Sequence, residues 1–171
     1  MNRPSSLWVF LNIVMIAVLG FGLYTLYNTI VDNVPLVGRR APAFSTTSLD
    51  GSSDFIYDIP EDGTYLIVVI NGGCHFCESM VPFLNQLYGN DDFHVLGVST
   101  SNQEETARFM MDNHVQFPVS LVSQDFDDSY RYTGTPTSFL IHNGIIEKIY
   151  TGKPTPEEMS YLLSLKTQGA L

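Results

Sequence analysis

Basic residues and cysteines are both scarce in this sequence. Eight lysines and arginines stand against 18 aspartates and glutamates, which gives a net charge of −10 over 171 residues. All of the acidic residues lie from Asp32 onward. Such a surface repels phosphate backbones, so nucleic acid is a poor candidate partner. The surplus of acidic side chains serves solubility first, and it also suits a basic partner protein.

Charge is missing altogether from a long segment near the N-terminus. As a helix, residues 7–31 would extend roughly 37 Å, enough to span a hydrocarbon core of about 30 Å with some tilt. Trp8 near one end, and Tyr24 and Tyr27 near the other, suit the two membrane interfaces. A cleaved signal peptide would have a shorter apolar region and a small-x-small cleavage site, which is not evident here. We therefore predict one retained transmembrane helix, a signal anchor, within residues 1–31.

A linker is predicted to follow the anchor. Residues 32–42 contain two prolines and a glycine without any periodic pattern, and they reach at most about 37 Å when fully extended. The folded domain, predicted over residues 43–171, would therefore work close to the membrane. Positive charge is nearly balanced across the anchor, with Arg3 before it and Arg39 and Arg40 after it. The side of the membrane is therefore inferred from the chemistry of the domain.

After the linker, buried-strand runs alternate with apolar residues at helical spacing. Asn143-Gly144 is a type I′ hairpin signal, and Thr155-Pro156-Glu157-Glu158 is a capping box that opens the last helix. A leading hairpin is expected within residues 44–57, around Asp50-Gly51. The other predicted strands cover residues 65–70, 93–98, 117–122, 138–141 and 145–150, and the predicted helices cover residues 74–88, 104–113 and 155–165. This order predicts an α/β fold with a central mixed sheet and helices on both faces.

The two cysteines of the chain, Cys74 and Cys77, form a single Cys-x-x-Cys motif. The motif directly follows a predicted buried strand and the turn Asn71-Gly72-Gly73, and it opens a predicted helix. At a helix N-terminus, unpaired backbone N–H groups and the helix dipole stabilise a thiolate, which is the form that attacks a disulfide. The second cysteine, one turn further on, is placed to resolve the mixed disulfide. This position predicts a redox-active pair.

Two structural roles for these cysteines are weaker alternatives. A stabilising disulfide usually closes a longer loop, because a four-residue ring constrains little chain entropy. A structural zinc site needs four ligands, and the histidines outside the motif, His94, His114 and His142, are scattered along the chain. We therefore predict no metal and no other cofactor.

These motifs together resemble the thioredoxin superfamily. The resemblance rests on Cys-x-x-Cys at a helix start, Pro82 five residues after the second cysteine, and Thr135-Pro136 ahead of a strand hairpin. Within the superfamily, the chain is similar to membrane-anchored oxidoreductases of the redoxin or TlpA type, which act on exported substrates and in cytochrome c maturation. Residues 38–44 (GRRAPAF), followed by Leu49-Asp50-Gly51, are similar to the start of their domains. The long stretch before Pro136 fits the extra strand and helix of this subgroup.

The resemblance implies a thioredoxin-like three-layer α/β/α fold and a protein-disulfide reductase or oxidoreductase. It implies that Cys74 is the nucleophile, that Cys77 is the resolving thiol, and that Pro136 is a cis-proline beside them. The backbone of Thr135 would then pair with an extended substrate. The expected partners are protein thiols or disulfides and a membrane or soluble redox protein. The expected location is the cell membrane, with a single span and the domain on the periplasmic, extracytoplasmic side.

Several positions depart from the family pattern. Gly73 replaces the usual aromatic residue before the first cysteine, and the two positions at which some members bury an acidic residue hold Val68 and Met80. His75 is expected to tune the redox potential, because a protonated imidazole beside the nucleophile stabilises the thiolate and makes the pair more oxidising. The alternative is a solvent-facing histidine of little influence. Phe76, the second residue between the cysteines, is expected to offer substrates an apolar contact.

Two other functions on the same fold are alternatives. A thiol peroxidase needs Pro-x-x-x-Thr-x-x-Cys, and the matching positions here hold Ile67, Asn71 and Cys74, so that motif fails. A copper-binding assembly chaperone would use a wider cysteine spacing and a distant histidine. His142 is the candidate for that third ligand, and the copper chaperone stays as the alternative.

Overall fold

The computed structural model describes residues 6–32, 36–49, 54–89 and 93–168. The chain divides into two compact units, Met1–Pro35 and Leu36–Leu171. The first unit contains helix α1 (Ser6–Asp32), which confirms the helix predicted from the uncharged segment. Its stretch Trp8–Leu26 has a mean hydropathy of 2.2 and is long and apolar enough to cross a membrane. Tyr24 is exposed on α1, whereas the side chain of Tyr27 lies outside the described part.

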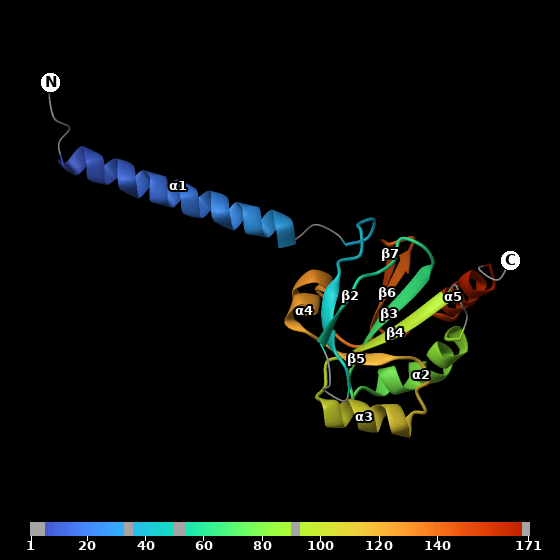
Figure 1. Cartoon of the computed structure of the whole chain (residues 1–171). Helices are drawn as coiled ribbons and strands as arrows, with labels where there is room; N and C mark the ends of the chain where they lie inside the picture. The colour runs from blue at the N-terminus through green and yellow to red at the C-terminus, as the bar shows by residue number, and fades with distance from the viewer. Residues whose placement is uncertain (1–5, 33–35, 50–53, 90–92, 169–171) are drawn as a thin grey trace. The chain divides into compact units, whose positions relative to one another are not determined.

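The second unit is built on a seven-stranded sheet with helices packed against it (Figure 1). The strands run in the order β2-β1-β5-β4-β3-β6-β7. Strand β3 pairs in parallel with β4 and antiparallel with β6, so the sheet is mixed, as predicted. The strands are β1 (Phe44–Thr47), β2 (Asp54–Tyr57), β3 (Thr64–Ile70), β4 (Phe93–Ser99), β5 (Val119–Leu121), β6 (Thr137–His142) and β7 (Ile145–Thr151). The helices are α2 (His75–Leu87), α3 (Gln103–Asp112), α4 (Gln124–Tyr130) and α5 (Pro156–Gln168).

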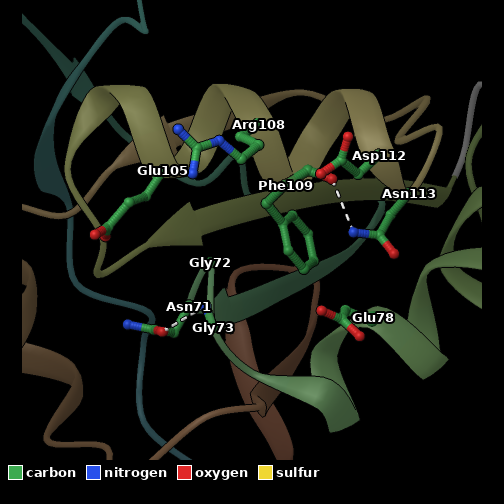
Figure 2. Close-up of a pocket in the computed structure, with 9 residues that line it drawn as sticks. All are labelled: Asn71, Gly72, Gly73, Glu78, Glu105, Arg108, Phe109, Asp112 and Asn113. Atoms are coloured by element: carbon green, nitrogen blue, oxygen red, sulfur yellow. Dashed lines mark hydrogen bonds between the residues drawn. The ribbon is translucent and has the colours of Figure 1, made fainter.

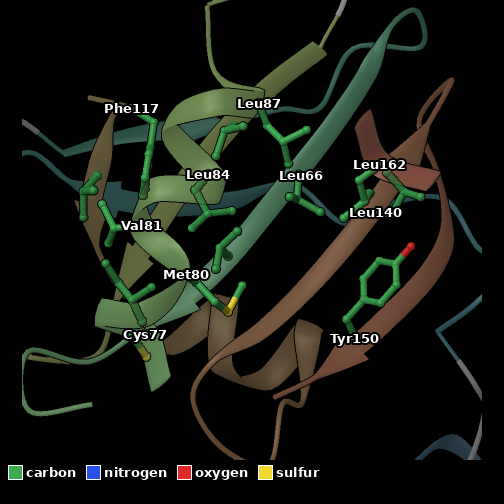
Figure 3. Packing of buried hydrophobic residues seen from close by; sticks show 14 of the residues in the cluster. Leu66, Cys77, Met80, Val81, Leu84, Leu87, Phe117, Leu140, Tyr150 and Leu162 are labelled. Atoms are coloured by element: carbon green, nitrogen blue, oxygen red, sulfur yellow. The ribbon is translucent and has the colours of Figure 1, made fainter. Parts of the chain in front are cut away.

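Helices cover both faces of this sheet, which gives the predicted three layers. On one face, Leu66, Val68 and Ile70 of β3 join a hydrophobic cluster with buried residues of α2, α3 and α5 (Figure 3). On the other face, Ile67 and Val69 of β3 join a cluster that includes α4. Successive residues of a strand point to opposite faces, so β3, buried along its whole length, contributes to both cores. The Cys-x-x-Cys helix α2 therefore begins at the end of the most buried strand.

The predicted turn and cap signals are confirmed in the structure. Asn143 and Gly144 have φ angles of 50° and 75°, the two positive values that a type I′ hairpin requires. The N–H of Thr155 donates to the Glu158 carboxylate at 2.9 Å, and the N–H of Glu158 donates back to Thr155 Oγ1 at 3.3 Å. The leading hairpin is present as the antiparallel pair β1 and β2. Its predicted Asp50-Gly51 turn lies outside the described residues.

Helix α4 is the element that the sequence patterns do not predict. It has seven residues, three of them aspartates, and buries Phe126 and Tyr130. These two rings stack on each other at 4.4 Å between centroids. At its start, Asp125 accepts hydrogen bonds at 2.8 Å from the backbone N–H and the hydroxyl of Ser45 in β1. Tertiary contacts therefore hold α4, and the chain leads from it directly to Thr135.

Part of the segment predicted as a linker is hydrogen-bonded to the sheet. The N–H of Gly38 donates to the carbonyl of Ile146 at 2.7 Å, and the N–H of Ala41 donates to the carbonyl of Gly144 at 2.8 Å. Arg40 forms an isolated antiparallel bridge with Ile145. The second unit therefore includes residues before 43, because residues 38–41 are hydrogen-bonded to β7 and the turn before it.

Candidate active site

Cys74 and Cys77 form a disulfide at the N-terminus of α2. Cys74 is the N-cap residue, and its Sγ accepts a hydrogen bond from the N–H of Cys77 at 3.1 Å. Cys77 is 1% exposed, whereas Cys74 is half-buried. The first cysteine is therefore the accessible one, and it also occupies the positive end of the helix dipole.

The core behind the disulfide is apolar. Val68 and Met80, the two positions at which members of the superfamily bury an acid, are 0% and 1% exposed and share a hydrophobic cluster with Cys77 (Figure 3). Burial in such surroundings disfavours the charged form of a thiol. When the pair is reduced, the negative charge is therefore expected on Cys74 and the proton on Cys77.

Thr135 and Pro136 lie beside the disulfide, between α4 and β6. The peptide bond between them is cis. The carbonyl oxygen of Thr135 is 3.5 Å from the Sγ of Cys74. A disulfide sulfur carries no hydrogen, so this contact becomes a hydrogen bond only when Cys74 is a thiol. Pro136 is buried and Thr135 half-buried, so the backbone of Thr135 lies at the accessible edge of the redox pair.

The two residues between the cysteines point to solvent. The side chain of His75 is 89% exposed, and its Nδ1 lies 3.2 Å from the Glu78 carboxylate. Phe76 is 65% exposed. Both side chains therefore stand where a docking protein would meet them, and their effect on the redox potential stays a prediction.

A pocket of about 540 Å³ opens between the turn before α2 and helix α3 (Figure 2). Figure 2 shows α3 on one side of this pocket and the turn with Glu78 of α2 on the other. Its lining includes the carboxylates of Glu78, Glu105 and Asp112. Arg108 also lines it, but its guanidinium is paired with Glu104 at 2.9 Å. The pocket is therefore acidic overall. Its complete lining is Asn71, Gly72, Gly73, Glu78, Glu105, Arg108, Phe109, Asp112 and Asn113.

His142, the third ligand in the copper-chaperone alternative, lies far from the redox pair. His142 ends β6, whereas Thr137, next to Pro136, begins it, and six residues of strand span roughly 17 Å. The Nδ1 of His142 lies 3.0 Å from Thr64 Oγ1, at that far end of the sheet. Within the described ranges, no three His, Cys, Asp or Glu side chains are grouped so that they could hold a metal ion.

Sequence reasoning missed the contribution of α3 to the site. The helix itself was predicted, over residues 104–113, and is confirmed as α3. Its contact with the turn before Cys74 carries no local signal, because it joins residues about 30 positions apart. Ser101, which binds the N–H of Gly72 at 2.9 Å, was missed for the same reason. The only hint was Gly72 itself, since a glycine after a buried strand often marks a close backbone approach.

Comparisons with known proteins agree with this geometry. The family model described as Redoxin matches residues 36–163. The thiol-disulfide oxidoreductase ResA of Geobacillus kaustophilus is 30% identical over 161 residues, which cover 90% of this chain and 91% of that protein. The methylamine utilization protein MauD of Methylobacillus flagellatus is 23% identical over 119 residues, 68% of this chain and 58% of that protein.

Solved structures share the fold. A thiol:disulfide interchange protein of the thioredoxin family from Chlorobium tepidum superposes with a TM-score of 0.65 at 19% identity, over 78% of this chain and 99% of that chain. StoA from Bacillus subtilis superposes with a TM-score of 0.58 at 23% identity, over 75% of this chain and 99% of that chain. The fold is thus thioredoxin-like, the class predicted from the sequence. The chain belongs to the Redoxin family, and it is a thioredoxin-like thiol–disulfide oxidoreductase.

Proposed function

We propose that Cys74 is the attacking thiolate and Cys77 the resolving thiol in exchange with protein disulfides. In the reducing direction, the Cys74 thiolate attacks one sulfur of a substrate disulfide, forms a mixed disulfide and releases one substrate thiolate. Cys77 loses its proton and attacks Cys74, which releases the second substrate thiolate and leaves the enzyme oxidised. Two electrons pass to the substrate, and a redox protein must return them. The same steps in reverse oxidise a dithiol.

One observation carries this assignment: the two sulfurs differ in access and in electrostatic surroundings. Cys74 caps α2, and its Sγ accepts a hydrogen bond from the N–H of Cys77 at 3.1 Å, a geometry that stabilises a thiolate. Cys77 is buried at 1% exposure among apolar side chains. The site therefore offers an incoming disulfide a single accessible nucleophile.

The proposed substrate class follows from two surfaces near Cys74. The half-buried backbone of Thr135 suits an extended polypeptide that pairs with it as an added strand. Gly73, the residue before Cys74, lines the pocket that carries the carboxylates of Glu78, Glu105 and Asp112. Opposite charges across an interface favour encounter and fix register. We therefore propose protein substrates that carry lysine or arginine close to the reactive cysteine.

The cellular setting is the finer part of the proposal. Helix α1 would hold the enzyme in the cell membrane as a single span, with the domain on the extracytoplasmic side, where disulfide exchange is needed. Exported proteins, including those of cytochrome c maturation, would be the substrates, and a membrane or soluble redox protein would return the electrons. His75 would raise the potential when protonated, and Glu78 at 3.2 Å would offset part of that charge.

The test is to trap the mixed disulfide in full-length protein held in detergent micelles. Cys77→Ser should accumulate a covalent adduct with a fluorescent peptide disulfide, because the resolving thiol is gone, whereas Cys74→Ser should form none. Peptides with lysine beside the cysteine should react faster than matched peptides with glutamate, and high salt should narrow the difference. Equal trapping by both serine variants would contradict the assignment of roles. Equal rates for both peptides would contradict the proposed substrate class.

A further inference from the structure

The turn before α2 is fixed by hydrogen bonds that reach a second element. Three successive N–H groups precede the helix, and each has an acceptor. The N–H of Gly73 donates to Asn71 Oδ1 at 3.0 Å, and the N–H of Cys74 donates to the Asn71 carbonyl at 3.1 Å. The N–H of Gly72 donates to Ser101 Oγ at 2.9 Å. The bond to Ser101 is the one of the three that leaves the turn, and it ends in the loop between β4 and α3.

Two further hydrogen bonds join the same region. The side-chain amide of Asn71 donates to Thr100 Oγ1 at 3.0 Å, and the N–H of Thr100 donates to the carbonyl of Ile70 at 2.9 Å. Thr100 and Ser101 of the loop therefore hold Asn71 and Gly72 of the turn, respectively. Asn71 also accepts the N–H groups of Gly73 and Cys74, so its orientation sets the start of α2.

The loop that carries Ser101 is itself anchored in the core. The N–H of Ser101 donates to Ser99 Oγ at 3.2 Å, and Ser99 Oγ lies 2.7 Å from Thr106 Oγ1. Ser99 and Thr106 are 1% and 0% exposed. Thr106 Oγ1 also donates to the carbonyl of Asn102 at 2.8 Å, which ties the loop to the first turn of α3. Buried, satisfied hydrogen bonds of this kind hold one geometry.

Close packing adds to these bonds. A Cβ atom on Gly72 would lie 3.2 Å from both the Cβ and the carbonyl oxygen of Glu105, and 3.3 Å from Ser101 Oγ. The turn therefore lies directly against α3, and a larger residue at Gly72 would require Glu105 or Ser101 to shift by a few tenths of an ångström. Gly72 and Glu105 both line the acidic pocket (Figure 2).

We propose that Ser101 is a positioning residue of the redox site, which acts through Gly72 to hold the Cys74 N-cap. The inference rests on the proposed role of Cys74 as the nucleophile. Stabilisation of a thiolate by a helix N-terminus depends on where the N–H groups point, and a fixed turn keeps them in place before the charge develops. The hydroxyl of Ser101 accepts its hydrogen bond from Gly72, so its effect on Cys74 passes through the turn.

The experiment compares Ser101→Ala with Ser101→Thr, which keeps the hydroxyl, and with Asn102→Ala. Asn102 is the N-cap of α3, and its Oδ1 accepts a hydrogen bond from the N–H of Glu105 at 2.9 Å, so its substitution controls for simple destabilisation of α3. Full-length protein in micelles is reduced, and two quantities are measured: the ultraviolet thiolate signal against pH, and the rate of attack on a peptide disulfide at neutral pH.

Ser101→Ala should form thiolate only at higher pH and attack about two- to tenfold more slowly, the loss expected for one hydrogen bond. Ser101→Thr should restore both quantities, and Asn102→Ala should lower Tm while leaving both unchanged. An unaltered thiolate titration in Ser101→Ala would overturn the positioning role. Equal changes of the titration and the rate in Ser101→Ala and Asn102→Ala would overturn it too. Either result leaves the proposed function intact. If unsubstituted protein forms no Cys74 thiolate at all, the proposed function fails, and the positioning role fails with it.

Discussion

Tyr130 anchors α4, the helix that leads to Thr135 and Pro136, and its substitution tests how this side of the site is held. The side chain is 0% exposed. Its ring stacks on Phe126 at 4.4 Å between centroids and meets Phe139 edge-on at 5.0 Å. Its hydroxyl donates to a backbone carbonyl, that of residue 42, at 2.8 Å. Burial raises the pKa of this phenol, so the hydroxyl remains a donor well above neutral pH.

The hydroxyl and the ring of Tyr130 should contribute separately to the free energy of unfolding. Tyr130→Phe removes one buried hydrogen bond and leaves its carbonyl acceptor without that donor, which should lower the free energy of unfolding by about 1–2 kcal/mol. Tyr130→Ala also removes the ring and opens a cavity, so the loss should reach about 3–5 kcal/mol. At about 2–4 °C per kcal/mol for a chain of this size, the phenylalanine variant should melt about 2–8 °C lower.

The assay is urea unfolding of the oxidised full-length protein in micelles, followed by near-ultraviolet circular dichroism. Tyr161→Phe is the matched control, because Tyr161 also donates a hydrogen bond, to Glu147 at 3.1 Å, but is 41% exposed. The control should change stability by less than about 0.5 kcal/mol. Equal losses of stability in the Tyr130→Phe and Tyr161→Phe variants would contradict the role given to the buried hydroxyl of Tyr130.

Three further predictions concern a charge, a cap and a surface side chain. Hydrogen bonds from Ser123 and Ser45 lower the pKa of Asp125 from 3.8 to about 2. The stability that the Asp125 carboxylate contributes is therefore complete above about pH 4 and is lost as the pH falls toward 2. Acid unfolding of Asp125→Asn should lack this loss of stability, which is below about 1 kcal/mol because the carboxylate is exposed. Thr155→Ala removes the cap of α5 and should cost about 1 kcal/mol in urea unfolding, and an unchanged midpoint would contradict the capping box. Phe76→Ala should leave Tm unchanged, because the ring is 65% exposed, but lower kcat/KM for peptide disulfides with apolar flanks; a fall in Tm would mean that the ring supports the fold.

Features with a local signal could be predicted from the sequence. The buried run before Cys74, the helical spacing after it and the Asn143-Gly144 turn each depend on neighbouring residues, and all three are confirmed. The fold class followed from their order. The uncharged N-terminal segment predicted a helix for the same reason, and α1 confirms it.

Features held by distant contacts could not be predicted in this way. Helix α4 has weak helical character of its own and is held by Ser45 and by aromatic packing around Phe126. The hydrogen bond from Gly72 to Ser101 and the acidic pocket both depend on a loop and a helix about 30 residues away. Residues 38–41 were predicted as part of a linker because their hydrogen-bond partners, in β7 and in the turn before it, follow about 100 residues later in the chain.

The reduction potential of the Cys74–Cys77 pair tests most directly whether these cysteines form the active site. It is measured on the full-length protein by equilibration with glutathione and quantification of free thiols. We expect one reversible two-electron couple, abolished by Cys74→Ser, between the thioredoxin and DsbA values of about −270 and −120 mV. A value near the lower limit would mark a reductant, and a value near the upper limit would mark an oxidant tuned by His75. Cysteines that form no disulfide at any glutathione ratio, or a disulfide that no ratio reduces, would contradict the assignment of this pair as the active site.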